Sequence, residues 1–361
     1  MRKVLVPAFN TVPDLEEMFA AVGAEIVYAL PEEERAYGRA AVERFDLRNR
    51  MIAEAFDRLL PELSAVNAMG VGRHWPITAE MIDRADLLET IFIGAAGYDQ
   101  IDVAAASARG VMVFNAPGGN AVGVAEHAIG LMLSLTRRIA DLDRISHAEH
   151  RWSKNHYDSS GPRLALLKGK TLGLAGFGFI GRHVAMRAIA GFGMKVVAFD
   201  PFYDPVEAGR QGVELISSLD RVLEQSDIVS LHLPLNADTR NIIDARALGL
   251  MKPSAYLINT GRGETVDTDA LVAALRAGTL AGAALDVVAP EPLPDGHALY
   301  GLENAILTPH IGGATPEDVA NAARFAARQA ALTLAGERVA NACNPQAWET
   351  HMKRFATSRS R

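Results

Sequence analysis

The chain has 361 residues, of which 49% are hydrophobic and 22% charged, a balance typical of a globular protein with two domains. Its net charge of −7 disfavours a nucleic-acid-binding protein, which usually carries a basic excess. The single cysteine, Cys343, excludes an intrachain disulfide and a cysteine-based metal cluster, and we predict no metal site. The brief apolar run after Met1 indicates a first strand rather than a signal peptide, and no apolar stretch is long enough to span a bilayer. We therefore expect a cytoplasmic protein with no membrane or nucleic-acid partner.

Short apolar runs alternate with helical patterns through the first third of the chain. Strands are predicted at residues 4–9, 25–30, 65–72, 90–94 and 111–115. Helices are predicted at residues 14–22, 39–60, 78–84 and 101–109. Alternation of this kind favours a parallel sheet covered by helices.

A second alternating series follows a glycine- and proline-rich junction at residues 116–120. One long helix is predicted at residues 121–150 and a surface loop at 151–163. Further strands are predicted at 172–175, 195–199, 228–233, 255–259, 283–287 and 305–307. Further helices are predicted at 180–190, 219–225, 245–251, 268–277 and 316–335, the last after Thr315 as a candidate N-cap. The fold class is therefore α/β, with two doubly wound parallel-sheet domains.

A glycine fingerprint lies between the first strand and the first helix of the second series. Gly176 permits a tight turn, Gly178 lets the backbone approach a pyrophosphate, and Gly181 lets the helix pack close to the strand. The amides near Phe179 and Ile180 would face the phosphate charge. A bare structural turn and a glycine-rich turn of a methyltransferase are the alternatives.

Asp200 strengthens the interpretation as a dinucleotide site, because it ends the next predicted strand. A carboxylate at this place can accept hydrogen bonds from both adenosine ribose hydroxyls and would repel a 2′-phosphate. No arginine follows it to offset that repulsion, since the next residues are Pro201 and Phe202. The cofactor is therefore predicted to be NAD rather than NADP.

Three polar residues, Arg262, Glu291 and His310, follow predicted strands of the second series. Histidine can exchange the hydroxyl proton of a 2-hydroxy acid as hydride leaves or enters C2. A carboxylate on the other ring nitrogen fixes the tautomer and favours the imidazolium, and an arginine can bind a substrate carboxylate. Each residue alone could equally be a surface arginine, a solvated loop glutamate or a structural histidine, and spacing does not show that they converge.

The ordered motifs resemble those of the D-isomer-specific 2-hydroxyacid dehydrogenase family, which includes phosphoglycerate, glycerate and D-lactate dehydrogenases and hydroxypyruvate reductases. The likeness covers roughly residues 78–336. Besides the glycine fingerprint and Asp200, it rests on residues 97–102 (GYDQID), 120–127 (NAVGVAEH), 232–235 (HLPL), 259–263 (NTGRG), 285–287 (LDV), 290–292 (PEP) and 308–313 (TPHIGG).

The resemblance implies roles for individual residues. Arg262, Glu291 and His310 are expected to be catalytic, with Arg262 also binding substrate. Pro234, Thr260 and Asp286 are expected to bind the cofactor, Asp286 through the nicotinamide carboxamide. The backbone at Ala96 and Gly97 is expected to bind the substrate carboxylate. Arg73 is a further substrate-binding candidate and, with Lys154 or His156, could hold a substrate phosphate; solvent-facing charge is the alternative.

The resemblance also implies a domain order. Residues 1–115 and 313–345 would form a flavodoxin-like substrate domain, and an inserted Rossmann domain, residues 116–312, would bind NAD. Residues 346–361, with Lys353 and Arg354, are expected to be a solvated tail. The apolar segment at residues 121–142 predicts a homodimer.

The expected function is NAD-dependent interconversion of a small D-2-hydroxy acid and its 2-oxo acid. Glutamate rather than glutamine at Glu291 disfavours formate as substrate, and no regulatory domain is expected after His310. The alternatives are an NAD-binding corepressor or scaffold on the same fold and an unusual dehydrogenase, such as a phosphite-type enzyme.

Overall fold

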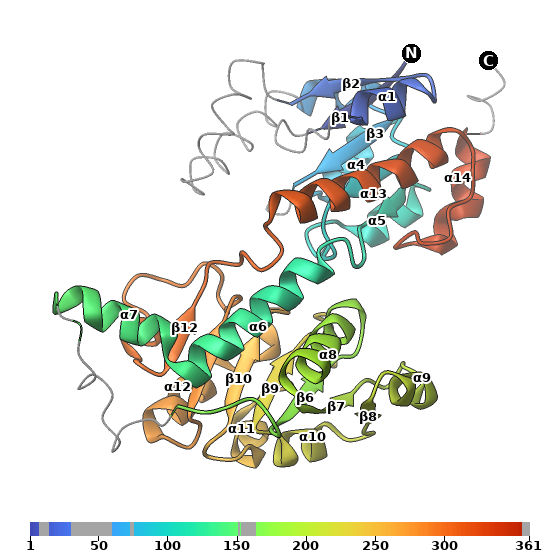
Figure 1. The fold of residues 1–361 in the computed structure, drawn as a ribbon. Helices are drawn as coiled ribbons and strands as arrows, with labels where there is room; N and C mark the ends of the chain where they lie inside the picture. Colours follow the sequence, from blue (N-terminus) through green and yellow to red (C-terminus); the bar gives the residue numbers. More distant parts are fainter. Residues whose placement is uncertain (7–13, 30–59, 73–75, 151, 153–163, 356–361) are drawn as a thin grey trace. The chain divides into compact units, whose positions relative to one another are not determined.

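The computed structural model describes residues 1–6, 14–29, 60–72, 76–150, 152 and 164–355 (Figure 1). The chain divides into two compact units. Unit 1 comprises Met1–Asn120 and Pro316–Arg361, and unit 2 comprises Ala121–Thr315. Unit 2 is therefore inserted into unit 1 along the chain, with divisions at 120/121 and 315/316, whereas the resemblance suggested divisions at 115/116 and 312/313. Within these described ranges, no helix has the length and apolar character needed to cross a membrane.

Unit 1 contains a parallel sheet of five strands in the order β2-β1-β3-β4-β5. This is the flavodoxin-like order. All residues of β3 and β4 are buried, as central strands covered on both faces must be. The strands are β1 (Arg2–Val6), β2 (Ala24–Tyr28), β3 (Ala68–Val71), β4 (Thr90–Ile93) and β5 (Met112–Phe114).

Short helices connect these strands: α1 (Leu15–Ala20), η2 (Leu60–Ala65), α4 (Ala79–Arg84) and α5 (Val103–Ala108). Side chains cap two of them, since Thr78 accepts from the Met81 amide and Asp102 from the Ala105 amide. The predicted helix at 39–60 lies almost wholly outside the described residues.

The long helix α13 (Pro316–Leu334) returns the chain to unit 1 and packs against β4. Six of its nine buried residues are alanine, which allows backbone to approach backbone. A Cβ atom at Gly94 would lie 2.9 Å from Cα of Ala323, so glycine on the strand side and alanine on the helix side together permit this close packing.

The expectation of a solvated tail from residue 346 is wrong for the described part. The chain there forms η6 (Pro345–Ala347) and α14 (Trp348–Phe355). His351 and Phe355 are buried, and the rings of Trp348 and His351 stack with centroids 5.2 Å apart. In the sequence, Lys353 and Arg354 lie between the two residues that are buried, so this segment was predicted as a solvated tail and not as a packed helix.

Unit 2 contains a parallel sheet of seven strands in the order β12-β11-β10-β9-β6-β7-β8. Six of them reproduce the Rossmann order, and the seventh extends it at β12. The strands are β6 (Thr171–Ala175), β7 (Lys195–Phe199), β8 (Val213–Leu215), β9 (Ile228–Leu231), β10 (Tyr256–Asn259), β11 (Gly282–Leu285) and β12 (Ala305–Leu307). Two parallel-sheet α/β domains are thus confirmed.

The helices of unit 2 that follow β6 are α8 (Phe179–Phe192), α9 (Pro205–Arg210), α10 (Leu219–Gln225), α11 (Ala245–Leu250) and α12 (Thr268–Ala277), with short turns η4 (Gly263–Thr265) and η5 (Ala298–Gly301). The sequence analysis missed α9 and β8. β8 is a three-residue edge strand with too little apolar pattern to detect. α9 did carry a signal, because Asp204 caps it and Pro205 occupies its first turn.

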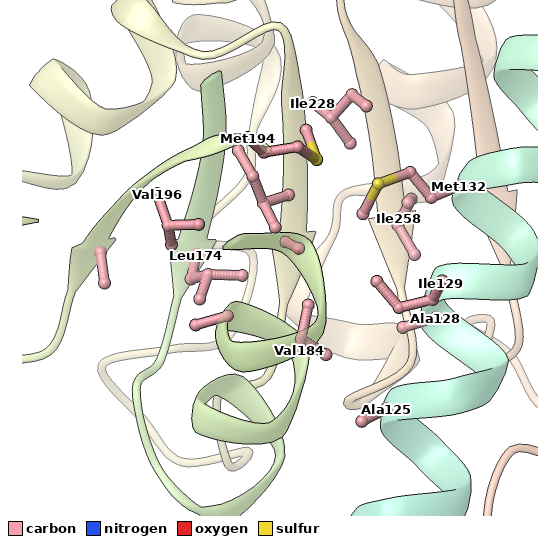
Figure 2. Packing of buried hydrophobic residues seen from close by; sticks show 14 of the residues in the cluster. Ala125, Ala128, Ile129, Met132, Leu174, Val184, Met194, Val196, Ile228 and Ile258 are labelled. Carbon is pink, nitrogen blue, oxygen red and sulfur yellow. The ribbon is translucent and has the colours of Figure 1, made fainter. Parts of the chain in front are cut away.

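The single helix predicted at 121–150 is two helices, α6 (Ala121–Arg137) and α7 (Ile139–Ala148). Arg138 between them has a positive φ of 52° and pairs with Asp141 in the first turn of α7. Figure 2 shows why α6 is held: Ala125, Ala128, Ile129 and Met132 face the core of unit 2. No residue of α7 is fully buried in the described part of the chain.

Candidate active site

One row of aligned residues ends six strands of the unit 2 sheet. Leu307, Leu285, Asn259, Leu231, Ala175 and Phe199 pair in register from β12 to β7. The next residue on each strand is therefore at the same carboxyl edge, where open α/β sheets bind ligands. These six residues are Thr308, Asp286, Thr260, His232, Gly176 and Asp200.

The glycine turn follows β6 at this edge. Gly176 has φ +97°, and a Cβ on it would lie 2.8 Å from the His232 carbonyl oxygen. A Cβ on Gly181 would lie 2.4 Å from the Gly176 carbonyl oxygen, whereas one on Gly178 would meet nothing within 4 Å. Two glycines thus close the turn, and the open side at Gly178 leaves backbone accessible to a pyrophosphate.

The first turn of α8 fits an anion. Gly178 is its N-cap and supplies no side-chain hydrogen bond to the amides that follow, which include those of Ile180 and Gly181. Phe179 begins the helix with 52% of its side chain exposed. These features fit the pyrophosphate of a dinucleotide cofactor.

Asp200 lies beside the turn. Its Oδ2 accepts the Phe177 amide at 2.9 Å, and its Oδ1 accepts the Phe202 amide at 2.9 Å. A carboxylate has about four acceptor positions, so two remain for ribose hydroxyls. The two backbone hydrogen bonds fix the orientation of the side chain beside the glycine turn.

His310 and Glu291 converge, as the sequence suggested without being able to show. His310 Nδ1 lies 2.7 Å from Glu291 Oε1, and the two side chains are 24% and 36% exposed. A carboxylate at this nitrogen makes Nδ1 the protonated one. In the neutral ring, Nε2 then carries no proton.

The segment that carries His310 is fastened to Asp286. His310 has a positive φ of 55°, which is rare for a residue with a side chain. Its amide donates to the Asp286 carbonyl oxygen at 2.8 Å. The Asp286 carboxylate accepts the Ile311 amide at 2.9 Å and the Gly312 amide at 2.8 Å.

Asp286 is 3% exposed and fully ionised at neutral pH. Burial raises the pKa of Asp286, but hydrogen bonds from His127, Thr308, Ile311 and Gly312 together outweigh burial and lower it to about 2. The carboxylate is thus turned toward these protein donors.

Arg262 follows β10 in a turn that is held by two hydrogen bonds of the buried Asn259 side chain. The Asn259 side chain donates to the Arg262 carbonyl oxygen at 2.9 Å and accepts the Gly261 amide at 3.0 Å. A Cβ on Gly263 would lie 2.0 Å from the Val288 carbonyl oxygen, so only glycine fits after the arginine. The register places Arg262 at the same sheet edge as His310, one strand beyond Asp286.

His232 and Thr260 stand at the middle of this edge, next to the glycine turn. Their side chains approach to 3.4 Å, between Nδ1 and Oγ1, and His232 Nε2 lies 3.0 Å from Ser230 Oγ. Burial lowers the pKa of His232 to about 3, so a neutral imidazole supports Thr260. Pro234 is exposed two residues after His232.

The expected substrate-binding residues Ala96 and Gly97 belong to unit 1. Ala96 and Gly97 follow β4, and the Ala96 carbonyl oxygen accepts the Asn115 side chain at 2.6 Å. Arg73, Lys154 and His156 lie outside the described residues.

The sequence analysis assigned no role to His127 or Thr308. Both stood in the motifs that carried the family resemblance, which was the available signal. His127 Nε2 lies 3.0 Å from Thr308 Oγ1 and 3.3 Å from Asp286 Oδ1.

Comparisons with known proteins agree with this geometry. Residues 129–312 match the family model for the NAD-binding domain of D-isomer specific 2-hydroxyacid dehydrogenases. The chain is 44% identical over 269 residues to a glyoxylate reductase of Thermofilum pendens, covering 72% of this chain and 76% of that one. It is 40% identical over 288 residues to a D-3-phosphoglycerate dehydrogenase of Mycobacterium tuberculosis, covering 80% of this chain and 53% of the relative, so it spans about half of that protein.

The fold is similar to that of a D-lactate dehydrogenase from Aquifex aeolicus solved with NAD and lactic acid. The TM-score is 0.72 at 26% identity, covering 92% of this chain and 96% of that one. The family model and the relatives indicate the same family, and the glycine turn and Asp200 at the sheet edge fit its NAD-binding domain. The chain belongs to the D-isomer specific 2-hydroxyacid dehydrogenase family, a family of NAD-dependent oxidoreductases.

Proposed function

We propose that this protein interconverts a small D-2-hydroxy acid and its 2-oxo acid with NAD(H), using His310 as acid and base. The observation that carries the proposal is the 2.7 Å contact between His310 Nδ1 and Glu291 Oε1. The pair stands on the same sheet edge as the glycine turn and Asp200.

The hydride and the proton of the reaction come from separate sources. NADH, held by the glycine turn and Asp200, would supply the hydride for C2 of the oxo acid. His310 donates the proton from Nε2 to the C2 oxygen, and in the reverse direction it takes that proton from the hydroxyl. Glu291 holds the ring and stabilises the charge on the imidazolium.

Arg262 is proposed to bind the substrate. Its guanidinium carries five N–H donors in a planar fork, which suits a carboxylate and can also polarise the C2 oxygen. The hydrogen bond from Asn259 and the close approach of the Val288 backbone fix the backbone that carries the Arg262 side chain.

The substrate is proposed to be a 2-oxo acid of the size of glyoxylate or hydroxypyruvate, free or phosphorylated. The relatives named glyoxylate reductase and D-3-phosphoglycerate dehydrogenase support this range. A panel of glyoxylate, pyruvate, hydroxypyruvate and 3-phosphohydroxypyruvate with NADH distinguishes the members. Absence of turnover with every member, with NADH and with NADPH, would remove the proposal.

The mechanism is tested by His310→Ala. Turnover is expected to fall at least about 10²-fold, the low end for acid–base catalysis. NADH binding, followed by fluorescence, is expected to persist, because the glycine turn and Asp200 are on other strands. His147→Ala, on a residue 84% exposed on α7, is the matched control and should keep full turnover. Near-native turnover of His310→Ala would rule out this acid–base assignment.

NAD is proposed to be preferred over NADP because of Asp200. Asp200→Ala is expected to lower the ratio of kcat/KM for NAD to that for NADP by at least about tenfold, or 1.4 kcal/mol. The exposed Asp204→Ala serves as control for a lost carboxylate nearby. Equal efficiency of the native protein with both cofactors would contradict the preference.

A homodimer is proposed as the solution state. Val122 is 44% exposed and Ile139 54% exposed on α6 and α7, and α7 buries none of its residues within the described chain. A second copy could cover this apolar surface. A monomer mass that does not change with concentration in light scattering would refute it.

No observation on the described residues favours a corepressor or a phosphite-type enzyme.

A further inference from the structure

His127 joins α6 to the loop that carries His310. The residue is 181 positions away from Thr308 in sequence, yet its Nε2 lies 3.0 Å from Thr308 Oγ1. The same nitrogen lies 3.3 Å from Asp286 Oδ1. All three residues belong to unit 2.

The direction of these hydrogen bonds follows from the number of protons available. Thr308 has one hydroxyl proton, and its Oγ1 donates to Asp286 Oδ1 at 2.6 Å. His127 must then donate from Nε2, because Thr308 and ionised Asp286 can only accept from it. This fixes the Nε2–H tautomer and makes His127 the outermost donor of the network.

Asp286, which these hydrogen bonds hold in place, in turn binds the backbone of the loop that carries His310. Its carboxylate holds the amides of Ile311 and Gly312, and its carbonyl oxygen holds that of His310. The left-handed conformation of His310 is unfavourable for a residue with a side chain. Such a conformation persists only where its surroundings enforce it.

The imidazole of His127 also packs against this loop. A Cβ added to Gly312 would lie 3.3 Å from His127 Cδ2 and 3.0 Å from Asp286 Oδ2. The ring and the carboxylate thus leave little space into which the loop could shift.

We propose that His127 is a positioning residue that, through Thr308 and Asp286, holds the loop carrying His310 in the conformation in which His310 meets Glu291. The inference rests on the proposed function, since it assumes that His310 transfers the proton. It also assigns Asp286 chiefly to anchoring this loop.

The test compares His127→Leu with His127→Gln. Leucine fills the space without a donor, whereas the glutamine amide places an N–H near the position of Nε2. For His127→Leu, kcat for reduction of a 2-oxo acid is expected to fall about 10- to 100-fold, the effect of misplacing a catalytic group by up to about 1 Å. Affinity for NADH should stay within about twofold (under about 0.5 kcal/mol). Glutamine should restore most of kcat.

A second measurement needs neither cofactor nor substrate. Hydrogen exchange of the peptide that spans residues 308–312 should become faster in His127→Leu and return toward the native rate in His127→Gln. His147→Leu, the same change at an exposed position, should alter neither rate. If His127→Leu does not fold, Thr308→Val breaks the same link while keeping the shape of the side chain, and the same losses are expected.

The outcomes separate the two proposals. Native kcat and native exchange in His127→Leu would overturn the positioning role while leaving His310 as the acid. Equal losses in the leucine and glutamine variants, or loss of NADH binding with unchanged loop exchange, would also overturn it, since packing alone would explain them. Full turnover in His310→Ala would instead overturn the proposed function.

Discussion

Among the individual residues, Glu291 is expected to contribute to turnover through its contact with His310. Its Oε1 lies 2.7 Å from His310 Nδ1, where a carboxylate fixes the tautomer and the orientation of the ring. Glu291→Gln keeps a hydrogen-bond acceptor but removes the charge, and kcat for reduction of a 2-oxo acid is expected to fall at least about tenfold. Native kcat of this variant in steady-state assays would contradict the pairing.

Asp286 provides a prediction of how stability depends on pH. The pKa of Asp286 is about 2 in the folded protein against an ordinary 3.8, with burial opposed by its hydrogen bonds. A lowered pKa adds stability above the unfolded value that disappears as pH falls through the folded value, here between about 4 and 2. The contribution is about 2 kcal/mol at neutral pH, and about half of it should be gone by pH 3.

The variant that isolates this term is Asp286→Asn. Urea unfolding at pH 6, 4 and 3 should show native protein more stable than the variant at pH 6, with the difference shrinking toward pH 3. Asp143→Asn on exposed α7 is the control, with no such convergence expected. A difference that stays constant with pH would show that the carboxylate charge does not contribute.

At the scale of elements, the turn after β10 depends on contact between two backbones. A side chain on Gly263 would collide with the Val288 carbonyl oxygen at 2.0 Å, and backbone cannot step aside as a flexible side chain can. Gly263→Ala should therefore destabilise the protein by at least about 2 kcal/mol. It should also lower kcat, because Arg262 projects from this turn. Thermal unfolding and turnover measure both effects.

Gly249→Ala gives the matched comparison. A Cβ there meets nothing within 4 Å, and the residue lies inside α11. Alanine should be neutral or stabilising by up to about 1 kcal/mol. Equal behaviour of the two variants would mean that Val288 does not constrain the turn.

At the scale of the whole molecule, unit 1 is completed by chain that returns after unit 2. Asn344 is fully buried, its Oδ1 accepts the Val113 amide at 2.8 Å, and its Nδ2 donates to the Val111 carbonyl oxygen at 2.9 Å. The last described segments are thus bonded to β5 and the turn before it.

Asn344→Leu should destabilise unit 1 by about 2–4 kcal/mol, because it leaves two buried backbone groups without partners. The exposed neighbour Gln346→Ala should change stability by less than about 0.5 kcal/mol. Differential scanning calorimetry compares the two. An Asn344→Leu protein as stable as native would mean that these hydrogen bonds can be replaced.

Features that depend on local chemistry could be predicted before the fold was known. Buried parallel strands must be continuous apolar runs, so most strands of both sheets were predicted close to their observed bounds. The glycine turn and Asp200 could be predicted because backbone geometry and charge allow few other residues there.

Contacts between residues far apart in the sequence could be found only in the folded chain. The bond between His127 and Thr308 joins residues 181 positions apart, and no local pattern encodes it. The pairing of Glu291 with His310 depends on how two loops leave neighbouring strands. The end of α6 before Arg138 and the packing of α14 depend on which helix faces are buried against the rest of the chain. Periodicity shows that a segment is amphipathic, but burial, which the rest of the fold supplies, decides where it ends and what it touches.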